Sequence, residues 1–261
     1  MLLAEPPETA YDFRFNFLGF PVRIAVTFWL GAVVFGYHLC QDFAGEELGI
    51  GPLMIAWALC VFISILIHEL GHALAFRFYG IQSSIVLYHF GGLAIPTSSY
   101  MPGRSISRIG EKQQLIISAA GPGLQLLSAL VVVLVIKLFG YEVTAFRFMP
   151  SFLAELPWVT DGERMDSRGM LALSTFYLLP SVLWAFLNLV PVWPLDGGQI
   201  ARSLILMNRG TVAQSLWLSV ICSGALVFYA LSNQQPMMAI FFAMFGFSSY
   251  QMLNPMNNSW R

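Results

Sequence analysis

Charged residues are scarce in this chain: they make up 10% of its 261 residues, against about 25% in an ordinary soluble domain. Hydrophobic residues make up 57%, and the mean hydropathy is +0.69. The formal net charge is only −1, which excludes the basic field of a nucleic-acid-binding protein. The composition therefore predicts a membrane protein that has the lipid bilayer as its surroundings and no nucleic-acid partner.

Paired cysteines and a secretion signal are also lacking. Cys40, Cys60 and Cys222 all stand in apolar runs, which is typical of small buried side chains and not of a disulfide framework. The N-terminal residues MLLAEPPETAYDF have no basic region before an apolar run, so we expect no cleavable signal peptide. No stretch is long and polar enough for a separate soluble module, which predicts a single domain over residues 1–261.

Long apolar runs are what the sequence does contain. A helix needs about 20 apolar residues to cross the hydrocarbon core of a bilayer, and six stretches come close. They lie at about residues 20–40, 52–79, 113–139, 170–193, 212–231 and 237–253. The first is weakened by Arg23 and the last by its polar residues. The predicted fold class is an all-α polytopic membrane protein with about six transmembrane helices.

The lysines and arginines in the connections predict the orientation, because positive charge collects on the cytoplasmic side. With a cytoplasmic N-terminus, nine of the 13 lie inside and four outside. The inner set is Arg14, Arg23, Arg77, Arg104, Arg108, Lys112, Arg202, Arg209 and Arg261, and the outer set is Lys137, Arg147, Arg164 and Arg168. Both termini are therefore expected in the cytoplasm.

The second apolar run contains the first half of a zinc site, His68-Glu69-Leu70-Gly71-His72. Residues i and i+4 share one face of a helix, so the two imidazoles can bind one ion. Glu69 lies beside the metal and can take a proton from the attacking water. A chance occurrence of this pattern would place three ionisable groups in one apolar turn, at about 2.5 kcal/mol or more for each unpaired charge. Metal coordination offsets that cost, so the pattern indicates one Zn²⁺.

A catalytic zinc needs a third protein ligand, and Asp196 is the strongest one in the sequence. It stands in the segment NLVPVWPLDGG, where Pro191 and Pro194 end the fourth span. An Asp-Gly pair is also a common turn, which leaves a purely structural role open. With the orientation above, the second and fourth spans both run towards the cytoplasm. His68 and Asp196 would both lie late in these spans, so we expect the site near the cytoplasmic side.

With these two motifs in place, the chain resembles the site-2 protease family of intramembrane zinc metalloproteases, in its compact six-span form. The resemblance covers nearly the whole chain and rests on HELGH at 68–72, NxxPxxPxDG at 188–197, Phe90-Gly91-Gly92 and Ala120-Gly121-Pro122. It implies that zinc is held by the second and fourth spans, and that the substrates are transmembrane proteins or peptides cut in or beside their membrane segments. It also implies the cytoplasmic membrane of a prokaryote.

The same resemblance indicates two amide side chains that could assist the reaction. Asn188 matches a family position and is the better candidate for orienting substrate or stabilising the oxyanion. Members often carry asparagine three residues after the Gly-Pro pair, where this chain has Gln125, so a role for Gln125 in substrate binding is the weaker expectation.

Residues 81–97 predict one or two short membrane-associated strands after the second span, because β-branched and aromatic residues dominate between Gly80 and Pro96. A free strand edge could hold an unwound substrate by β-addition, with Gly91 and Gly92 permitting close backbone approach. A simple hairpin that covers the site is an equally good interpretation. His89 is expected to be a polar loop residue.

Two rival functions remain open. One is a membrane peptidase of the CAAX-processing type with a glutamate ligand, although few acidic residues lie near a later span. The other is a non-catalytic scaffold or metal-binding relic. If Asp196 is not the third ligand, Glu111 is the next acid to consider.

Overall fold

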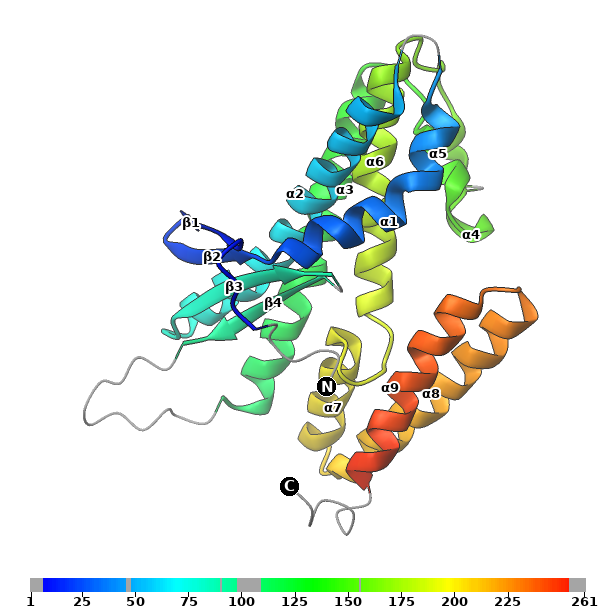
Figure 1. Cartoon of the computed structure of the whole chain (residues 1–261). Helices are drawn as coiled ribbons and strands as arrows, with labels where there is room; N and C mark the ends of the chain where they lie inside the picture. The colour runs from blue at the N-terminus through cyan, green and yellow to red at the C-terminus, as the bar shows by residue number, and fades with distance from the viewer. Residues whose placement is uncertain (1–6, 46–47, 90, 98–108, 155, 254–261) are drawn as a thin grey trace. The chain divides into compact units, whose positions relative to one another are not determined.

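The structure is a computed structural model that describes residues 7–45, 48–89, 91–97, 109–154 and 156–253 (Figure 1). Phe90, Arg104, Arg108 and Arg261, which entered the sequence predictions, lie outside the described residues. The chain divides into two compact units. The first contains the described residues within 1–101 and 123–185, and the second those within 102–122 and 186–261.

A four-stranded sheet lies in the first unit, in the order β1-β2-β3-β4. The strands are β1 (Phe13–Phe17), β2 (Phe20–Ile24), β3 (Ser83–Tyr88) and β4 (Gly91–Pro96). Two antiparallel hairpins, β1-β2 and β3-β4, are joined by parallel pairing of β2 with β3. Strands β3 and β4 confirm the strands expected within 81–97, whereas β1 and β2 were not predicted.

The expected span at about 20–40 needs correction. Residues 20–24 form strand β2, in which Phe20, Val22 and Ile24 are buried, and helix α1 (Val26–Phe43) begins only afterwards. Among the described residues, five helices are long and apolar enough to cross a membrane, and α1 is not one of them. They are α2 (Ile50–Phe78), α3 (Glu111–Leu138), α6 (Arg168–Asn188), α8 (Val212–Ser232) and α9 (Pro236–Leu253). The helical membrane fold is confirmed, but the count of six spans is not.

One face of the sheet packs against α2, the helix that carries HELGH. The shared core consists of buried residues from β2, α1, α2 and β3: Phe20, Val22, Ile24, Phe28, Ile65, Leu66, Leu70, Ala73, Ile85 and Leu87. Helix α1 also packs closely on α2, where Trp57 lies directly against Gly36 and its Nε1 donates a hydrogen bond to the Ala32 carbonyl at 2.8 Å. Figure 1 shows α1 running from the sheet along α2. The sheet and α1 thereby fix the rotation of α2.

The long connection after α3 is folded rather than extended. It contains the 3-10 helix η1 (Thr144–Phe148), α4 (Ser151–Ala154) and α5 (Pro157–Thr160). Val143, Phe146, Met149 and Val159 from this connection pack with residues of α3 and α6 in a second apolar cluster. The connection therefore holds these ends of α3 and α6 in place.

The second unit contains the first residues of α3 and the helices α7 (Asp196–Met207), α8 and α9. Helices α8 and α9 form an antiparallel pair (Figure 1), with Gly246 directly against Ser223 and the hydroxyl oxygens of Ser219 and Ser249 2.8 Å apart. Helix α7 was not predicted. Its polar first turn, DGGQ, gives no apolar run by which a membrane helix could be recognised.

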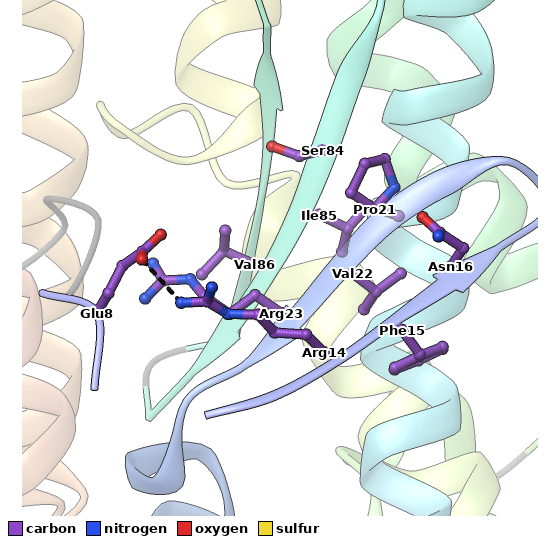
Figure 2. Close-up of a pocket in the computed structure, with 10 residues that line it drawn as sticks. All are labelled: Glu8, Arg14, Phe15, Asn16, Pro21, Val22, Arg23, Ser84, Ile85 and Val86. Carbon is purple, nitrogen blue, oxygen red and sulfur yellow. Dashed lines mark hydrogen bonds and ion pairs between the residues drawn. The ribbon is translucent and has the colours of Figure 1, made fainter. Parts of the chain in front are cut away.

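The other face of the sheet carries a polar hollow of about 350 Å³ (Figure 2). Arg14 and Arg23 are register partners on β1 and β2, and both guanidinium groups lie there. Arg23 forms an ion pair with Asp12 at 3.0 Å, and Arg14 forms one with Glu8 at 2.7 Å. The hydrogen bond from Thr9 lowers the pKa of Asp12, with a smaller contribution from Arg23. Glu8 and Asp12 thereby neutralise the two arginines.

Candidate metal centre

His68 and His72 lie one turn apart on α2 and face the same point. Both are buried, with 2% and 7% of their surface exposed. Their Nε2 atoms are 3.2 Å apart. Two imidazole nitrogens that converge in this way can bind one cation, because a shared metal satisfies both lone pairs at once.

Asp196 comes from a tight turn between α6 and α7. Helix α6 ends at Asn188, and Asp196 is the first residue of α7. Side chains at Gly197 and Gly198 would overlap the backbone at Leu189–Val190 and at Val192–Trp193, so the turn closes only with glycine at both positions. Ser219 on α8 accepts a hydrogen bond from the Trp193 backbone N–H at 2.8 Å. The end of the fourth span expected at Pro191 and Pro194 is therefore followed by an ordered turn that leads into α7 at Asp196.

His68, His72 and Asp196 form a group of buried potential ligands. One ligand atom from each residue lies within 4.8 Å of the others. Within the described part of the chain, this is the one group of three His, Cys, Asp or Glu residues that meets the requirement for a metal site. Two imidazoles and one carboxylate match the open catalytic type of zinc site, which leaves a fourth position for water. The alternative acid Glu111 is exposed and does not belong to this group.

The side chain of Glu69 extends from α2 towards β4, the last strand of the sheet. It is 4% exposed, and Gly92 of β4 lies directly against its side chain. Burial, with a smaller contribution from the charge of Glu69, raises the pKa of Tyr88 on β3 to about 12. The phenol is therefore neutral at pH 7. Sequence reasoning did not single out Tyr88.

Gly91 and Gly92 are both positions where a side chain does not fit. Gly91 has a φ of +116°, and a Cβ there would overlap the ring of Trp184 on α6. A Cβ at position 92 would overlap the Cγ and carboxylate of Glu69. The close backbone approach predicted for these glycines is therefore an approach to Glu69 and to Trp184.

We expect that replacing Gly92 by Ala or Val reduces cleavage on the order of 100-fold while zinc content stays normal. The added carbon displaces Glu69, and a displacement of about 1 Å in a reacting group costs that much. The three atoms nearest to the added carbon all belong to Glu69 and none to His68 or His72. Peptidase assays and metal analysis of the purified variant test this, with Gly123→Ala, which meets open space, as the control. Zinc loss in the Gly92 variant would instead show that the glycine serves packing.

The two predicted amides have different surroundings. Asn188 is the last residue of α6 and is 8% exposed. Gln125 on α3 is completely buried, and its Oε1 is 2.8 Å from Nδ1 of His68. Neither Ser64, which contacts the Gln125 amide, nor Ser181, which contacts Ser64, was identified from the sequence. Nothing in the sequence distinguishes these serines from ordinary helix-packing serines.

A helical membrane protein with a buried His-His-Asp group of this geometry is in the class of membrane metalloproteases. Residues 56–231 match the model of peptidase family M50, so the chain belongs to this family, the site-2 proteases. A zinc metalloprotease of Methanocaldococcus jannaschii is 26% identical over 205 residues, which are 77% of this chain and 47% of that one.

The structural comparison agrees at the level of the fold. The site-2 protease from Methanocaldococcus jannaschii superposes with a TM-score of 0.53 at 21% identity, over 94% of this chain and 96% of that one. The chain spans less than half the length of the curated relatives that it matches.

Proposed function

We propose that this protein is a zinc-dependent intramembrane endopeptidase that cuts peptide bonds within or next to transmembrane segments of membrane proteins. The observation that carries the proposal is the buried group of His68, His72 and Asp196 in a chain of apolar helices. Membership of peptidase family M50 supports the same reaction. The substrates proposed are transmembrane proteins or peptides that reach the enzyme through the bilayer.

The residues divide the chemistry among them. His68, His72 and Asp196 would hold one zinc ion. When bound, zinc polarises the scissile carbonyl and lowers the pKa of water towards ~7. Glu69 accepts the proton of the attacking water and passes it to the leaving amine. Asn188, at the end of α6, is proposed to orient the substrate or to stabilise the oxyanion.

Strand β4 is the proposed docking edge for the substrate. It is the last strand of the sheet, and no further strand pairs with it among the described residues. A transmembrane helix must unwind before cleavage, because its carbonyls are shielded by hydrogen bonds within the helix. Pairing with β4 would hold the unwound segment extended and satisfy its backbone groups. Gly92 lies on this strand against Glu69, so a segment paired there would lie beside the proton acceptor.

The site is proposed to open towards the cytoplasm of a prokaryotic cell, with both termini on that side, which requires α1 to cross the membrane as a sixth span beside the five long apolar helices. The excess of arginine and lysine in the connections on that side supports this orientation. The rival CAAX-type interpretation needs a glutamate ligand, and the acid that joins His68 and His72 is an aspartate. An intact His, Glu, His and Asp set likewise argues against a non-catalytic scaffold.

Removal of the metal tests the proposal. We expect purified full-length protein to contain about one zinc per chain, and to cleave a single-span model substrate in liposomes. Treatment with 1,10-phenanthroline should abolish cleavage, and added Zn²⁺ should restore it. Cleavage that survives complete metal removal would contradict the proposed mechanism. Zinc binding without cleavage of any of a panel of single-span substrates would favour the scaffold.

A further inference from the structure

A chain of buried hydrogen bonds runs from the first zinc ligand into the bundle of α2, α3 and α6. Oε1 of Gln125 lies 2.8 Å from Nδ1 of His68, and its Nε2 lies 2.9 Å from Oγ of Ser64. Oγ of Ser64 is 2.8 Å from Oγ of Ser181, which is 2.6 Å from the Tyr177 carbonyl oxygen. Gln125, Ser64 and Ser181 are all completely buried.

The backbone carbonyl of Ser64 fixes the orientation of the Gln125 amide. A carbonyl oxygen only accepts, and that of Ser64 lies 3.4 Å from Nε2 of Gln125, so the amide nitrogen faces Ser64. The same nitrogen donates to Oγ of Ser64. Ser181 is the donor in its contacts with Oγ of Ser64 and with the Tyr177 carbonyl oxygen, so it leaves Oγ of Ser64 as an acceptor.

This orientation of the amide determines the protonation of His68. The Gln125 oxygen faces Nδ1 and can only accept, so Nδ1 must carry a proton. A neutral imidazole has one proton, which leaves the lone pair on Nε2. Nε2 is the nitrogen that faces His72.

We propose that Gln125 is a positioning residue that holds His68 in the Nδ1–H tautomer, with Nε2 directed at the metal; this role rests on the zinc site proposed above. The amide has its oxygen on His68 and its nitrogen on Ser64, and it has no exposed surface to offer a substrate. Gln125 therefore acts on the reaction through the ligand and not through the substrate, in contrast to the role expected from the sequence.

Two substitutions of similar size separate this role from packing. Gln125→Met fills the same space but cannot accept from Nδ1–H, so zinc affinity should fall 10- to 100-fold, the usual effect of losing such a partner. Gln125→Glu keeps an acceptor on Nδ1–H and should retain the affinity of the wild type. A simple packing role predicts the reverse order, because a buried carboxylate is harder to accommodate than methionine.

The measurement is a chelator competition on full-length protein in detergent, in a Glu69→Gln background that prevents self-cleavage. Ser128→Ala is the matched control: its hydroxyl lies on the same helix turn and contacts the Gln125 carbonyl and the Tyr177 hydroxyl, but not His68. We expect the control to bind zinc as the wild type does. Equal zinc affinity of the methionine variant and the wild type would overturn the proposal.

A second measurement needs no stable variant at position 125. In metal-free wild-type protein labelled with ¹⁵N-histidine, the His68 signals, assigned by their loss in His68→Ala, should show a protonated Nδ1 and an unprotonated Nε2. The opposite tautomer would overturn the proposal. A wild type that binds no zinc would defeat the proposed function itself, whereas a zinc-binding wild type with the wrong tautomer would defeat only the role of Gln125.

Discussion

Replacing Glu69 by Gln should abolish cleavage while leaving zinc in place. The amide has the size of the carboxylate, and Glu69 is not in the ligand group, so the metal keeps its three protein ligands. The amide cannot accept a proton from the attacking water or deliver one to the leaving amine. The loss of a general base costs about 10²- to 10⁴-fold in rate. Metal analysis and cleavage of a single-span substrate in liposomes measure both effects on one preparation.

Two outcomes of that experiment would contradict the assignment. Loss of zinc in Glu69→Gln would make Glu69 a ligand and not a base. Retained cleavage would mean that another group takes the proton. Gly123→Ala is a control here as well. The added methyl group meets open space in the first unit, so the ligands and Glu69 stay as they are.

The three candidate metal ligands could be proposed from the sequence because the signal for two of them is local. A spacing of four residues on a helix places His68 and His72 on one face wherever that helix lies. Asp196 was predicted from two prolines and a shared depth in the membrane, and the buried group of three agrees with it. Neither inference required knowledge of which helices are neighbours.

The bond from Gln125 to His68 was beyond the sequence for the opposite reason. It depends on the rotation of α3 against α2, which is set by packing of side chains that look alike in the sequence. Ser64 lies four residues before His68 and so shares its face, but Ser181 lies on α6 and reaches Ser64 only through tertiary packing. From the sequence, Gln125 was a polar residue in an apolar helix, with a role in substrate binding expected from the family resemblance.

The error at residues 20–40 has a different cause. A window of hydropathy does not distinguish a buried strand followed by a helix from one long helix, because both are apolar. Strand β2 becomes recognisable only through its partners: β1 across a turn at Leu18 and Gly19, and β3, which lies beyond α1 and α2. Pairing between distant segments is not encoded in any local pattern, whereas the β-branched and aromatic composition of residues 81–97 was sufficient for β3 and β4.

Replacing Asp196 by Ala should reduce both zinc binding and cleavage. Two imidazoles remain, which is one fewer than the three protein ligands of a catalytic zinc site. Loss of a direct ligand should exceed the 10- to 100-fold change in affinity that follows loss of a residue behind a ligand. Helix α7 should keep its place, since Gly197, Gly198 and the Trp193–Ser219 hydrogen bond hold the turn without the carboxylate. Chelator competition and the liposome assay measure the two losses.

Glu111→Ala is the matched control, because Glu111 is the acid that would replace Asp196 as a ligand if the assignment were wrong. It stands exposed in the first turn of α3, so its removal should change neither zinc affinity nor cleavage. Full zinc and activity in Asp196→Ala, together with a loss in Glu111→Ala, would transfer the third ligand to Glu111. If only Asp196→Ala loses zinc affinity and cleavage, and the variant still folds, then Asp196 at the start of α7 is the residue that completes the zinc site.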